Sequence, residues 1–556
     1  MLALPRRKLC LSKKSVTPCC KAYFMIPPFD KRPSWLKSRG YIHITPKIDV
    51  YRRYQEIYSK VHSEKFVARH GFFPLIHSVI KERKYKKIPG GGRAHSFKKG
   101  NEYKQTAKLR PLHYATHIDA MIFGCYAEKL LKLYEDELKL YPGLSDCVIA
   151  YRKIEVEEAE EEDFVEYDDE NSHGKSTIHF AYEAFEEIKR RASDGCIVLM
   201  FDIKSFFSEL NHKRLKKAWC DLLKVERLNQ AHFNVFNAAT NFRYILKDEL
   251  RVEPQKRGRR SGFDEKKLAS IRKYNGVESF FSSIDDFKKA IENRDLKVYK
   301  QPFMKKNRPV GIPQGLPISA VLANLYLLEF DKVILENIVN KAGGFYRRYS
   351  DDIMIICKPE EATEIEKFVL EEIQKSDVEI STDKTEKFLF SIKQISPRIN
   401  RITSTLIGDD GKHPGKPLTY LGFEFYGYRT LIKSANLAKY YRRMITSLKR
   451  KVNRADKRRY SHDGDLILFP RQLKRIYNNI NLNKEKVPKK KKILVKNAQG
   501  FYHFNFKPLP LKAGSNYLSY TRRASRIMQQ PEIHKQIRNR RNIFYSAMAK
   551  HIKQKV

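Results

Sequence analysis

Residues 345–356 read FYRRYSDDIMII, in which two apolar arms enclose the acidic pair Asp351-Asp352. Residues 197–202 read IVLMFD, a second apolar run that ends in Asp202. Both runs are short and rich in β-branched and aromatic residues, and neither apolar core contains Pro or Gly, which predicts buried strands. The sequence therefore predicts a hairpin with an acidic pair at its tip, and another strand that brings a third carboxylate.

Carboxylates at the ends of buried strands need a chemical reason. Two like charges about 4 Å apart repel by roughly 4 kcal/mol at an effective dielectric constant near 20. Mg²⁺, which prefers oxygen ligands, removes that repulsion. Two such ions about 3.5–4 Å apart form the clamp used for in-line displacement at phosphorus. The alternative is that these residues are solvated aspartates in turns, and the apolar arms around them favour the metal site.

The charge of the chain indicates a polyanionic partner. The 556 residues contain 110 Lys and Arg against 64 Asp and Glu, a formal net charge of +46. Residues 434–556 alone contain 32 basic and 5 acidic residues. Such a field favours salt-dependent binding to a phosphate backbone, and the many Tyr and Phe residues among the basic ones suit base stacking. We therefore expect a nucleic-acid-binding protein with a basic C-terminal clamp.

Cysteine spacing and hydropathy exclude other classes. The eight cysteines include no C-x-x-C pair, so neither a zinc ribbon nor a disulfide framework is indicated. No run of about 18 apolar residues predicts a membrane span. The basic N-terminus lacks the apolar core of a secretory signal. We expect a cytoplasmic protein whose cysteines are ordinary core residues.

Changes in pattern organise the rest of the chain. Residues 47–87 carry apolar positions at helical spacing, and residues 113–140 predict one long helix. Residues 250–300 are charged and weakly periodic, which predicts an insertion or a helical subdomain. Residues 311–317 (GIPQGLP) predict a rigid turn before an apolar helix, and residues 418–425 predict a small hairpin strand.

The order of these segments resembles the motifs of reverse transcriptases over roughly residues 90–430. The segments that carry the resemblance are Phe201–Phe207 (FDIKSFF) for the first catalytic motif, Gly311–Gly315 with Pro317–Ser319 for the Pro-Gln-Gly motif, Tyr349–Asp352 for the Tyr-x-Asp-Asp box, Lys384-Thr385 for the lysine motif and Tyr420–Gly422 for the primer grip. Each of them is weak alone, but five in the right order are specific. Ser350 replaces the Ala that is common in the box.

The resemblance implies an α+β right-hand polymerase, with fingers, a palm made of an antiparallel sheet packed on helices, and a mainly helical basic thumb. The implied organisation is a basic N-terminal arm at 1–46, fingers at 47–200, a palm at 201–430 with a helical insertion at about 224–305, and a basic thumb and C-terminal nucleic-acid-binding region at 431–556.

Within this family, three further segments resemble bacterial defence-associated and abortive-infection enzymes, and more distantly retron and group II intron enzymes. These segments are Arg347–Asp352, Ala323–Tyr326 with Phe330-Asp331, and Ala150–Arg152. No maturase, integrase, RNase H or zinc endonuclease signature is visible. The resemblance implies an RNA template, with dNTPs as substrates and DNA as product. It also implies that this template is a cognate non-coding RNA and that the enzyme acts in antiphage defence. A homo-oligomer remains compatible with the sequence.

The resemblance also assigns the metal ligands. Asp202 and Asp351 are expected to bind two Mg²⁺ ions, with Mn²⁺ able to substitute, and Asp352 is expected as a weaker third ligand. The backbone carbonyl of Ile203 is expected to add a further ligand. The ions would lower the pKa of a primer hydroxyl and stabilise the pentavalent phosphorus.

Further residues receive roles with alternatives left open. Phe207, five residues after Asp202, is expected to lie under the sugar and exclude a 2′-hydroxyl; the alternative is a core residue. Gln314 is expected to touch the incoming nucleotide. Arg110, with Lys104 or Lys98, is expected to neutralise the triphosphate; the alternative is a solvated basic loop. Lys384 either protonates the leaving pyrophosphate or pairs with a nearby carboxylate.

The leading hypothesis is thus an RNA-directed DNA polymerase, a nucleotidyltransferase. The first alternative is untemplated or protein-primed DNA synthesis of the abortive-infection type. The second is an RNA-binding scaffold with a catalytically dead palm, which the presence of all three carboxylates disfavours. An RNA-dependent RNA polymerase is disfavoured by Phe207.

Overall fold

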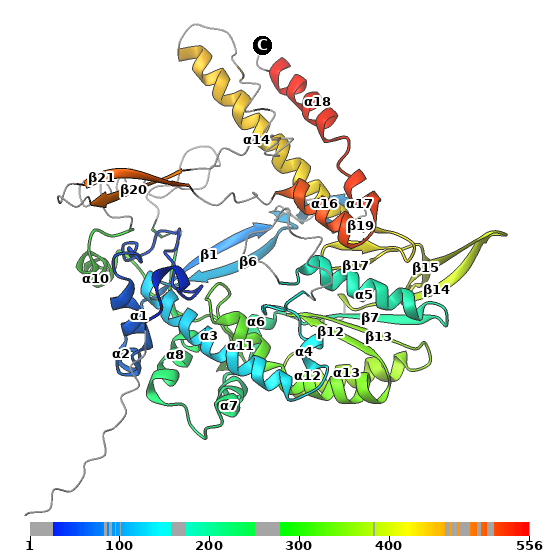
Figure 1. Cartoon of the computed structure of the whole chain (residues 1–556), viewed down its shortest axis with the longest axis horizontal. Coiled ribbons are helices and arrows are strands. Elements are labelled where there is room, and N and C mark those ends of the chain that lie inside the picture. The colour runs from blue at the N-terminus through cyan, green and yellow to red at the C-terminus, as the bar shows by residue number, and fades with distance from the viewer. Residues whose placement is uncertain are drawn as a thin grey trace, which may run out of the picture. The chain divides into compact units, whose positions relative to one another are not determined.

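The structure is a computed structural model that describes residues 26–82, 86–87, 92–94, 96–99, 102–156, 174–247, 249–250, 279–381, 384–461, 468, 473, 476, 490–496, 502–508 and 516–554. The chain divides into two units. Unit 1 comprises residues 1–128, 228–300 and 315–317, and unit 2 comprises residues 129–227, 301–314 and 318–556. Both units mix helices and sheet, as the predicted α+β class requires (Figure 1).

Unit 1 contains a four-stranded sheet in the order β6-β1-β8-β9. Strands β1 and β6 are antiparallel, and β8 runs parallel to β1. Its elements are η1 (Phe29–Lys31), α1 (Tyr54–His62), α2 (Glu64–Arg69), β1 (Leu75–Glu82), β2 (Lys86–Lys87), β3 (Arg93–Ala94), β4 (Ser96–Lys99), β5 (Glu102–Gln105), β6 (Lys108–Tyr114), α8 (Gln230–Thr240), β8 (Arg243–Leu246), α10 (Ile284–Glu292) and β9 (Tyr299–Lys300). Helix α3 (His117–Lys139) runs from unit 1 into unit 2.

Unit 2 is built on a six-stranded antiparallel sheet in the order β12-β13-β7-β14-β15-β16. The elements up to this sheet are α4 (Leu144–Cys147), α5 (Thr177–Arg191), β7 (Cys196–Asp202), α6 (Phe206–Glu209), α7 (His212–Leu223), β10 (Met304–Lys305), β11 (Arg308–Pro309), α11 (Ser319–Tyr326), α12 (Leu328–Ile334), η3 (Leu335–Lys341), β12 (Phe345–Tyr349), β13 (Asp352–Cys357), α13 (Ala362–Lys375), β14 (Glu386–Ser396), β15 (Ile399–Gly408) and β16 (Gly411–Pro414).

The centre of this sheet is buried on both faces, which explains its uninterrupted apolar strands. Met200 on β7 and Met354 on β13 are cross-strand partners that pack against residues of α5 such as Phe185. The alternate residues Leu199 and Ile355 are also buried. Figure 1 shows α5 on one side of the sheet, and α12 and α13 on the other. The two predicted strands therefore form the middle of the unit 2 core.

A small sheet and a helical region follow the main sheet in unit 2. The elements are β17 (Leu418–Tyr420), β18 (Phe423–Phe425), β19 (Thr430–Ile432), α14 (Ser434–Ser461), β20 (Lys490–Lys496), β21 (Tyr502–Pro508), α16 (Tyr517–Ile527), α17 (Pro531–Lys535) and α18 (Arg540–Lys553). Helices α14 and α18 pack together through Met444, Leu448 and Phe544. Strands β20 and β21 add an antiparallel hairpin to a region that is otherwise helical.

Two segments differ from the pattern expected of them. The helical pattern of 47–87 continues only to Arg69, and Leu75–Glu82 is strand β1. In the range 224–305, expected as a helical insertion, the described residues form α8 and α10 but also β8 and β9, which extend the unit 1 sheet. The domain boundaries themselves remain predictions.

Candidate active site

Two of the three predicted carboxylates lie on neighbouring strands at the same end of the unit 2 sheet. Asp202 is the last residue of β7, and Asp352 is the first residue of β13. They are direct cross-strand partners in the antiparallel register. Asp351 precedes Asp352 in the hairpin turn, and its carbonyl accepts a 2.9 Å hydrogen bond from the amide of Ile203. The structure therefore brings Asp202, Asp351 and Asp352 together, as the sequence predicted.

The turn that carries Asp351 has an unusual backbone. Ser350 is buried and has φ of +62°, the left-handed region that non-glycine residues rarely adopt. Strands β12 and β13 pair in register from Phe345 opposite Ile356 to Tyr349 opposite Asp352, so the turn contains only Ser350 and Asp351. The hairpin geometry thus fixes where Asp351 lies relative to β7.

A buried polar network centred on Arg348 stabilises this turn. Arg348 is fully buried and donates to both carboxylate oxygens of Asp331, at 2.7 and 2.5 Å. It also donates to the Ser350 carbonyl at 3.2 Å and to the Asn324 side chain at 3.3 Å. The Tyr346 hydroxyl donates to Asp331 at 2.6 Å. The strained turn is therefore tied to helices α11 and α12 through one guanidinium group.

The charges at the strand ends repel each other. Burial, reinforced by the neighbouring charges of Asp351 and Asp202, raises the pKa of Asp352 to about 6, although Lys384 and Lys433 oppose the shift. Lys384 forms an ion pair with Asp202 Oδ2. Of the two roles considered for Lys384, the geometry thus includes the pairing with a carboxylate. The electrostatic repulsion at Asp352 is of the kind that a bound cation relieves.

The donor set suits magnesium by its chemistry. Asp202, Asp351, Asp352 and the Ile203 carbonyl offer oxygen atoms only, and Mg²⁺ selects oxygen ligands. Within the described ranges, however, no three His, Cys, Asp or Glu side chains are grouped closely enough to hold an ion. Lys384 Nζ contacts Asp202 in this structure. These residues therefore fit a metal by the type of their donor atoms, and Asp202 would have to exchange its contact with Lys384 for the ion.

The segment just before Lys384 is hydrogen-bonded to the end of β7 and the residues that follow it. The Asp202 carbonyl accepts from the amide of Ser381 at 2.8 Å, and the Ser381 carbonyl accepts from the amide of Lys384 at 2.9 Å. The amide of Lys204 donates to the carbonyl of Glu379 at 2.8 Å. Backbone hydrogen bonds thus couple the position of Lys384 to that of Asp202.

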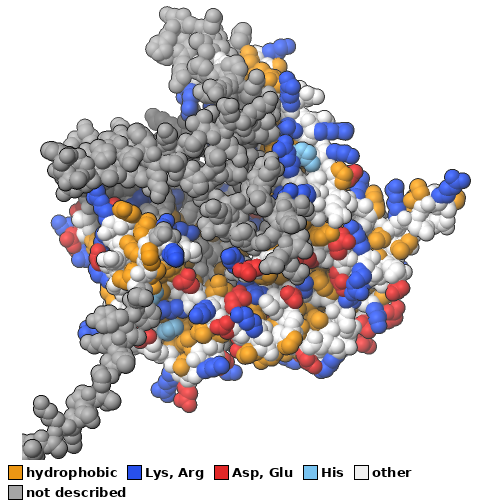
Figure 2. Space-filling view, in the orientation of Figure 1, with side chains coloured by type: hydrophobic (Ala, Val, Ile, Leu, Met, Phe, Trp, Pro, Cys, Tyr) orange, Lys and Arg blue, Asp and Glu red, His pale blue; other side chains and the backbone are white. Residues whose placement is uncertain are grey.

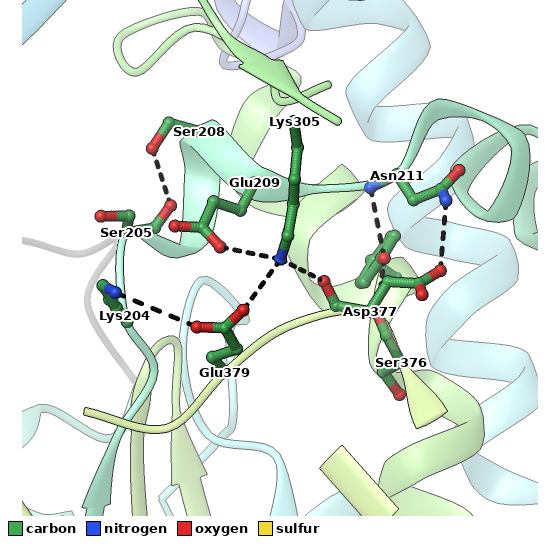
Figure 3. Close-up of polar contacts among 10 residues, drawn as sticks. Lys204, Ser205, Ser208, Glu209, Asn211, Lys305, Ser376, Asp377 and Glu379 are labelled. Atoms are coloured by element: carbon green, nitrogen blue, oxygen red, sulfur yellow. Dashed lines mark hydrogen bonds and ion pairs between the residues drawn. The ribbon is translucent and has the colours of Figure 1, made fainter. Parts of the chain in front are cut away.

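Lys305 stands at the centre of the side-chain contacts in this region (Figure 3). Its ammonium group donates to Glu209 at 3.2 Å, to Glu379 at 3.3 Å and to the Asp377 carbonyl at 3.4 Å. Burial would lower the pKa of Lys305, but the hydrogen bonds that it donates to Glu209 and Glu379 raise that pKa. Lys305 therefore stays charged and links α6, β10 and the segment before Lys384.

Phe207 and Gln314 lie on segments that are packed together. The Phe207 carbonyl accepts from the amide of Ile312 at 2.7 Å. Gly311 has φ of +75° and lies so close to Ser208 that a Cβ atom there would be 2.5 Å from the Ser208 carbonyl oxygen. Phe207 and Gln314 are both half-buried. Their side chains thus retain access to solvent, which a contact with a nucleotide requires.

Arg110 and Lys104 belong to unit 1, in contrast to the carboxylates. Arg110 lies on β6, is exposed, and forms an ion pair with Glu82 at 3.4 Å. Lys104 lies on β5, opposite Phe97 of β4. Lys98 is exposed on β4. Their expected contact with a triphosphate stays a prediction.

A basic cleft of about 850 Å³ lies beside α14 in unit 2. Lys439, Arg443 and Lys451 line it at intervals of four or eight residues, which places them along one face of the helix. Tyr440 and Tyr517 also line it, and their rings are stacked with centroids 4.3 Å apart. This combination of cations and aromatic rings suits nucleic acid.

The sequence alone did not identify Arg348, Asp331 or Lys305 as parts of this region. Arg348 and Asp331 are separated by 17 residues and Lys305 and Glu379 by 74, so no local pattern joins them. A charged residue within an apolar run, as Arg348 is, was the one available signal.

Among the described helices, none has the length and hydropathy of a membrane span.

Comparison with known proteins adds a family match. Residues 273–425 match the family described as reverse transcriptase (RNA-dependent DNA polymerase). This range contains Gln314, Asp351, Asp352 and Lys384 but not Asp202. No curated protein matches the chain. The match and the arrangement of helices and sheet are those of a right-hand polymerase fold.

Solved structures of two yeast telomerases also match. The structure of apo telomerase from Candida tropicalis, truncated from its C-terminal domain, is 12% identical with a TM-score of 0.32 over 64% of this chain. Telomerase from Candida albicans in complex with a fragment of telomeric RNA is 11% identical with a TM-score of 0.31 over 69% of this chain. This chain spans 57% and 49% of their lengths. We draw no conclusion from either.

Proposed function

We propose that this chain, which carries a reverse transcriptase domain match over residues 273–425, is an RNA-directed DNA polymerase that adds dNTPs to a 3′-hydroxyl group. The observation that carries the proposal is the direct pairing of Asp202 with Asp352 at the ends of β7 and β13, with Asp351 in the adjoining turn. Three half-buried carboxylates from segments 150 residues apart have no structural need to lie at one sheet end, whereas phosphoryl transfer uses such a group.

In the proposed mechanism, Asp202, Asp351 and Asp352 would hold a divalent ion, with the Ile203 carbonyl as a further oxygen ligand. Reverse transcriptases generally use divalent ions, typically Mg²⁺, and such an ion would activate the primer hydroxyl and neutralise the charge that develops on the phosphate. Lys384 would exchange its contact with Asp202 for one with the phosphates of the bound nucleotide, where it could donate a proton to the leaving pyrophosphate. Phe207 lies against the sugar and excludes a 2′-hydroxyl, and Gln314 contacts the nucleotide.

The basic C-terminal region is proposed to hold the template and primer. The support is the row Lys439, Arg443 and Lys451 beside the stacked pair Tyr440 and Tyr517, in a region with 32 basic and 5 acidic residues. A cognate non-coding RNA and a role in antiphage defence are proposed from the sequence resemblance alone. Sequencing of the RNA and DNA that co-purify with the protein tests both; random cellular RNA would contradict a cognate partner.

The first test is incorporation of labelled dNTPs on an RNA template with a DNA primer. Asp351→Asn keeps the shape of the side chain but removes its charge, so we expect a loss on the order of 10³-fold or more. The matched control is Asp409→Asn, which changes an exposed aspartate in the turn between β15 and β16 and should retain full activity. Wild-type incorporation by Asp351→Asn would refute the assignment.

The same assay separates the proposal from untemplated or protein-primed synthesis. We expect incorporation to depend on both template and primer, and the product to separate from the protein on denaturation. Product that forms without template, or that stays bound to denatured protein, would favour the alternative. No incorporation under any condition would favour an RNA-binding scaffold.

A further inference from the structure

The hairpin formed by β14 and β15 extends past the other strands of the unit 2 sheet (Figure 1). Strand β14 pairs with β7 only over Glu386–Phe390, and β15 pairs with β16 only over Thr405–Gly408. Between these ends, residues 391–404 form a two-stranded ribbon in the described structure. Its base contacts the body through the bridge between Thr403 and Gly427, the hydrogen bonds of Ser404 with Gly415 and Lys416, and the packing of Ile402 against the core. An isolated two-stranded ribbon is marginally stable in water, so an unpartnered ribbon of this length needs an explanation.

The ribbon carries apolar and basic residues and no acidic ones. Ile392, Ile395 and Ile399 are 47%, 57% and 43% exposed. Between Ser391 and Ser404 the charged residues are Lys393, Arg398 and Arg401, all basic. Lys393 and Arg401 are direct cross-strand partners, an unfavourable placement of like charges that an anion would relieve. Figure 2 shows basic and apolar side chains together on the projecting hairpin.

An aromatic turn lies against the base of the ribbon. Tyr428, in the turn between β18 and β19, is 44% exposed. The guanidinium groups of Arg401 and Arg429 lie 5.2 and 5.3 Å from the centroid of its ring. Arg429 also lies 4.6 Å from the ring of Tyr426. The Tyr428 ring is part-exposed and has two guanidinium groups within 5.3 Å of its centroid, so it offers aromatic surface to an unpaired base and cations to the phosphates beside it.

This surface is distant from the proposed catalytic centre. Glu386 at the start of β14 is opposite Met200, two residues before Asp202. Ile395 is nine residues further along β14, which at about 3.3 Å per residue is roughly 30 Å beyond Glu386. The Tyr426–Arg429 turn lies nearer, because Gly427 bridges to Thr403, which is opposite Ser391, roughly 17 Å beyond Glu386. A nucleic acid bound here therefore does not need to be the primer end.

We propose that the ribbon Ser391–Ser404 and the turn Tyr426–Arg429 bind an unpaired segment of RNA, at a site separate from the catalytic centre. A protein partner would have to supply acidic groups for three cations, whereas RNA supplies both the phosphates and the unpaired bases. The exposed amide of Asn400, opposite Gln394, adds a donor and an acceptor of the kind that a 2′-hydroxyl can use. RNA is therefore the occupant that matches each feature of the surface.

The test measures binding of a fluorescent single-stranded RNA to the full chain by anisotropy, over a series of salt concentrations and without nucleotides. All proteins in the series carry Asp351→Asn, so the result does not depend on polymerase activity. The ribbon variant combines Lys393→Glu, Arg398→Glu and Arg401→Glu. The control variant combines Lys213→Glu, Lys217→Glu and Lys367→Glu on exposed positions of α7 and α13, which changes the net charge by the same amount.

The ribbon variant is expected to bind RNA about tenfold more weakly than the control variant, and the slope of log K against log salt should fall by about 2, the value for three lost phosphate contacts to a single strand. Tyr428→Ala should also lose about tenfold, while Tyr428→Phe retains binding because the ring that stacks is kept. DNA of the same sequence should bind several-fold more weakly than RNA.

Three results would overturn the proposal. Equal weakening in the ribbon and control variants would mean that only the overall field attracts RNA. Equal affinity for DNA would remove the choice of RNA as occupant. Unchanged RNA affinity together with a shift from dimer to monomer in the ribbon variant, measured by sedimentation, would identify the ribbon as a contact between copies of this chain.

Discussion

Phe206 and Phe207 are adjacent residues in different environments. Phe206 is 3% exposed and belongs to the core, whereas Phe207 is half-buried. Their rings meet edge to face with centroids 5.7 Å apart. The sequence offered both a core role and a sugar-facing role for Phe207. Phe206 fills a core position at this junction, and the sugar-facing role of Phe207 stays a prediction.

Replacement of Phe207 tests this role at the scale of one residue. Phe207→Val shortens the side chain, so we expect incorporation of ribonucleotides to rise relative to deoxynucleotides by about tenfold, the size of a discrimination set by a steric contact. The measurement is the ratio of kcat/KM values for dNTP and rNTP. Phe233→Val, at an exposed phenylalanine on α8, is the control and should leave the ratio unchanged. The same unchanged ratio in Phe207→Val would make Phe207 a structural residue.

The ion pair of Arg348 and Asp331 is the clearest test of stability at this scale. Both side chains are fully buried, so Arg348→Met leaves a buried carboxylate without its cation, and we expect a loss of about 3–5 kcal/mol in the free energy of unfolding. Arg348→Met with Asp331→Leu removes both charges and should recover much of the loss. Urea denaturation measures both.

Arg52→Met is the control for that experiment, because the pair Arg52 and Asp49 is exposed. This change should cost less than about 1 kcal/mol. A double variant as unstable as Arg348→Met would contradict the explanation from an uncompensated charge.

Sequence reasoning could place Asp202, Asp351 and Asp352 at strand ends, because each lies at the end or the start of an apolar run. It could not pair Arg348 with Asp331, because that pairing depends on how α12 packs on β12.

At the scale of elements, the segment Ser376–Ser381 is held by polar contacts with α6, α7 and β10. Asp377 accepts from Asn211 at 3.1 Å and from Arg214 at 2.6 Å, and Lys305 reaches Glu209 and Glu379. This segment leads to Lys384, whose ion pair with Asp202 places it beside the carboxylates. Its position is therefore a condition for the proposed chemistry.

Replacement of Lys305 tests that condition. Lys305→Met removes the cation that joins Glu209 to Glu379. Glu379 keeps its 3.9 Å contact with Lys204, but its link to Glu209 is lost, so the segment should move, and displacement of a catalytic group by about 1 Å can cost on the order of 10²-fold. We expect kcat to fall by about tenfold to 10²-fold with little change in the KM for dNTP. Lys305→Arg should restore most of kcat because it keeps the charge. Lys288→Met, on an exposed face of α10, is the control.

Wild-type kcat in Lys305→Met would show that the segment does not depend on this contact. Parallel melting curves are needed as well, because a large loss of stability would explain a lower kcat without any movement of Lys384. Recovery by Lys305→Arg at equal stability is the result that a merely structural role would not give.

Strand β1 shows why some elements were not predictable. Its sequence LIHSVIKE places apolar residues at 75, 76, 79 and 80, the spacing of a helix face. Only Leu75 and Ile76 are buried, while Val79 and Ile80 are 39% and 50% exposed. The strand forms because Ile76 pairs with Tyr114 on β6 and with Ile245 on β8. Those partners are distant in sequence, so tertiary pairing overrides the local pattern. β7 and β13 lack this ambiguity because they are buried on both faces.

At the scale of the whole molecule, the fold has to tolerate a net charge of +46. Protonation of a histidine adds to this positive charge. A buried histidine that stays neutral in the folded state therefore affects how stability depends on pH. The described part of unit 1 contains three such histidines. Burial lowers the pKa of His43 to about 3, of His113 to about 3 and of His117 to about 4. His43 accepts the amide of Ile44 at Nδ1, at 2.8 Å, which requires a neutral ring at that nitrogen.

These histidines predict that stability falls with acidity. Each has a lower pKa in the folded state than its ordinary value of 6.5, so below pH 6.5 the unfolded chain binds more protons than the folded chain. The stabilisation is therefore complete above pH 6.5 and is lost as the pH falls from 6.5 to about 4 for His117 and to about 3 for His43 and His113. Each histidine contributes up to about 1.4 kcal/mol per pH unit in this window. Hydrogen exchange should show unit 1 amides losing protection between pH 7 and pH 5, after correction for intrinsic rates.

His117→Phe separates this effect from general acid denaturation. His117 is fully buried and stacks on Tyr41 with the rings 13° from parallel, so Phe preserves the stacking and removes the titrating group. The variant should lose about a third of the pH dependence of unit 1 while leaving the pH dependence of α5 and β7 in unit 2 unchanged. A pH dependence of the same size in His117→Phe would mean that carboxylates and net charge, not buried histidines, set the acid limit of this fold.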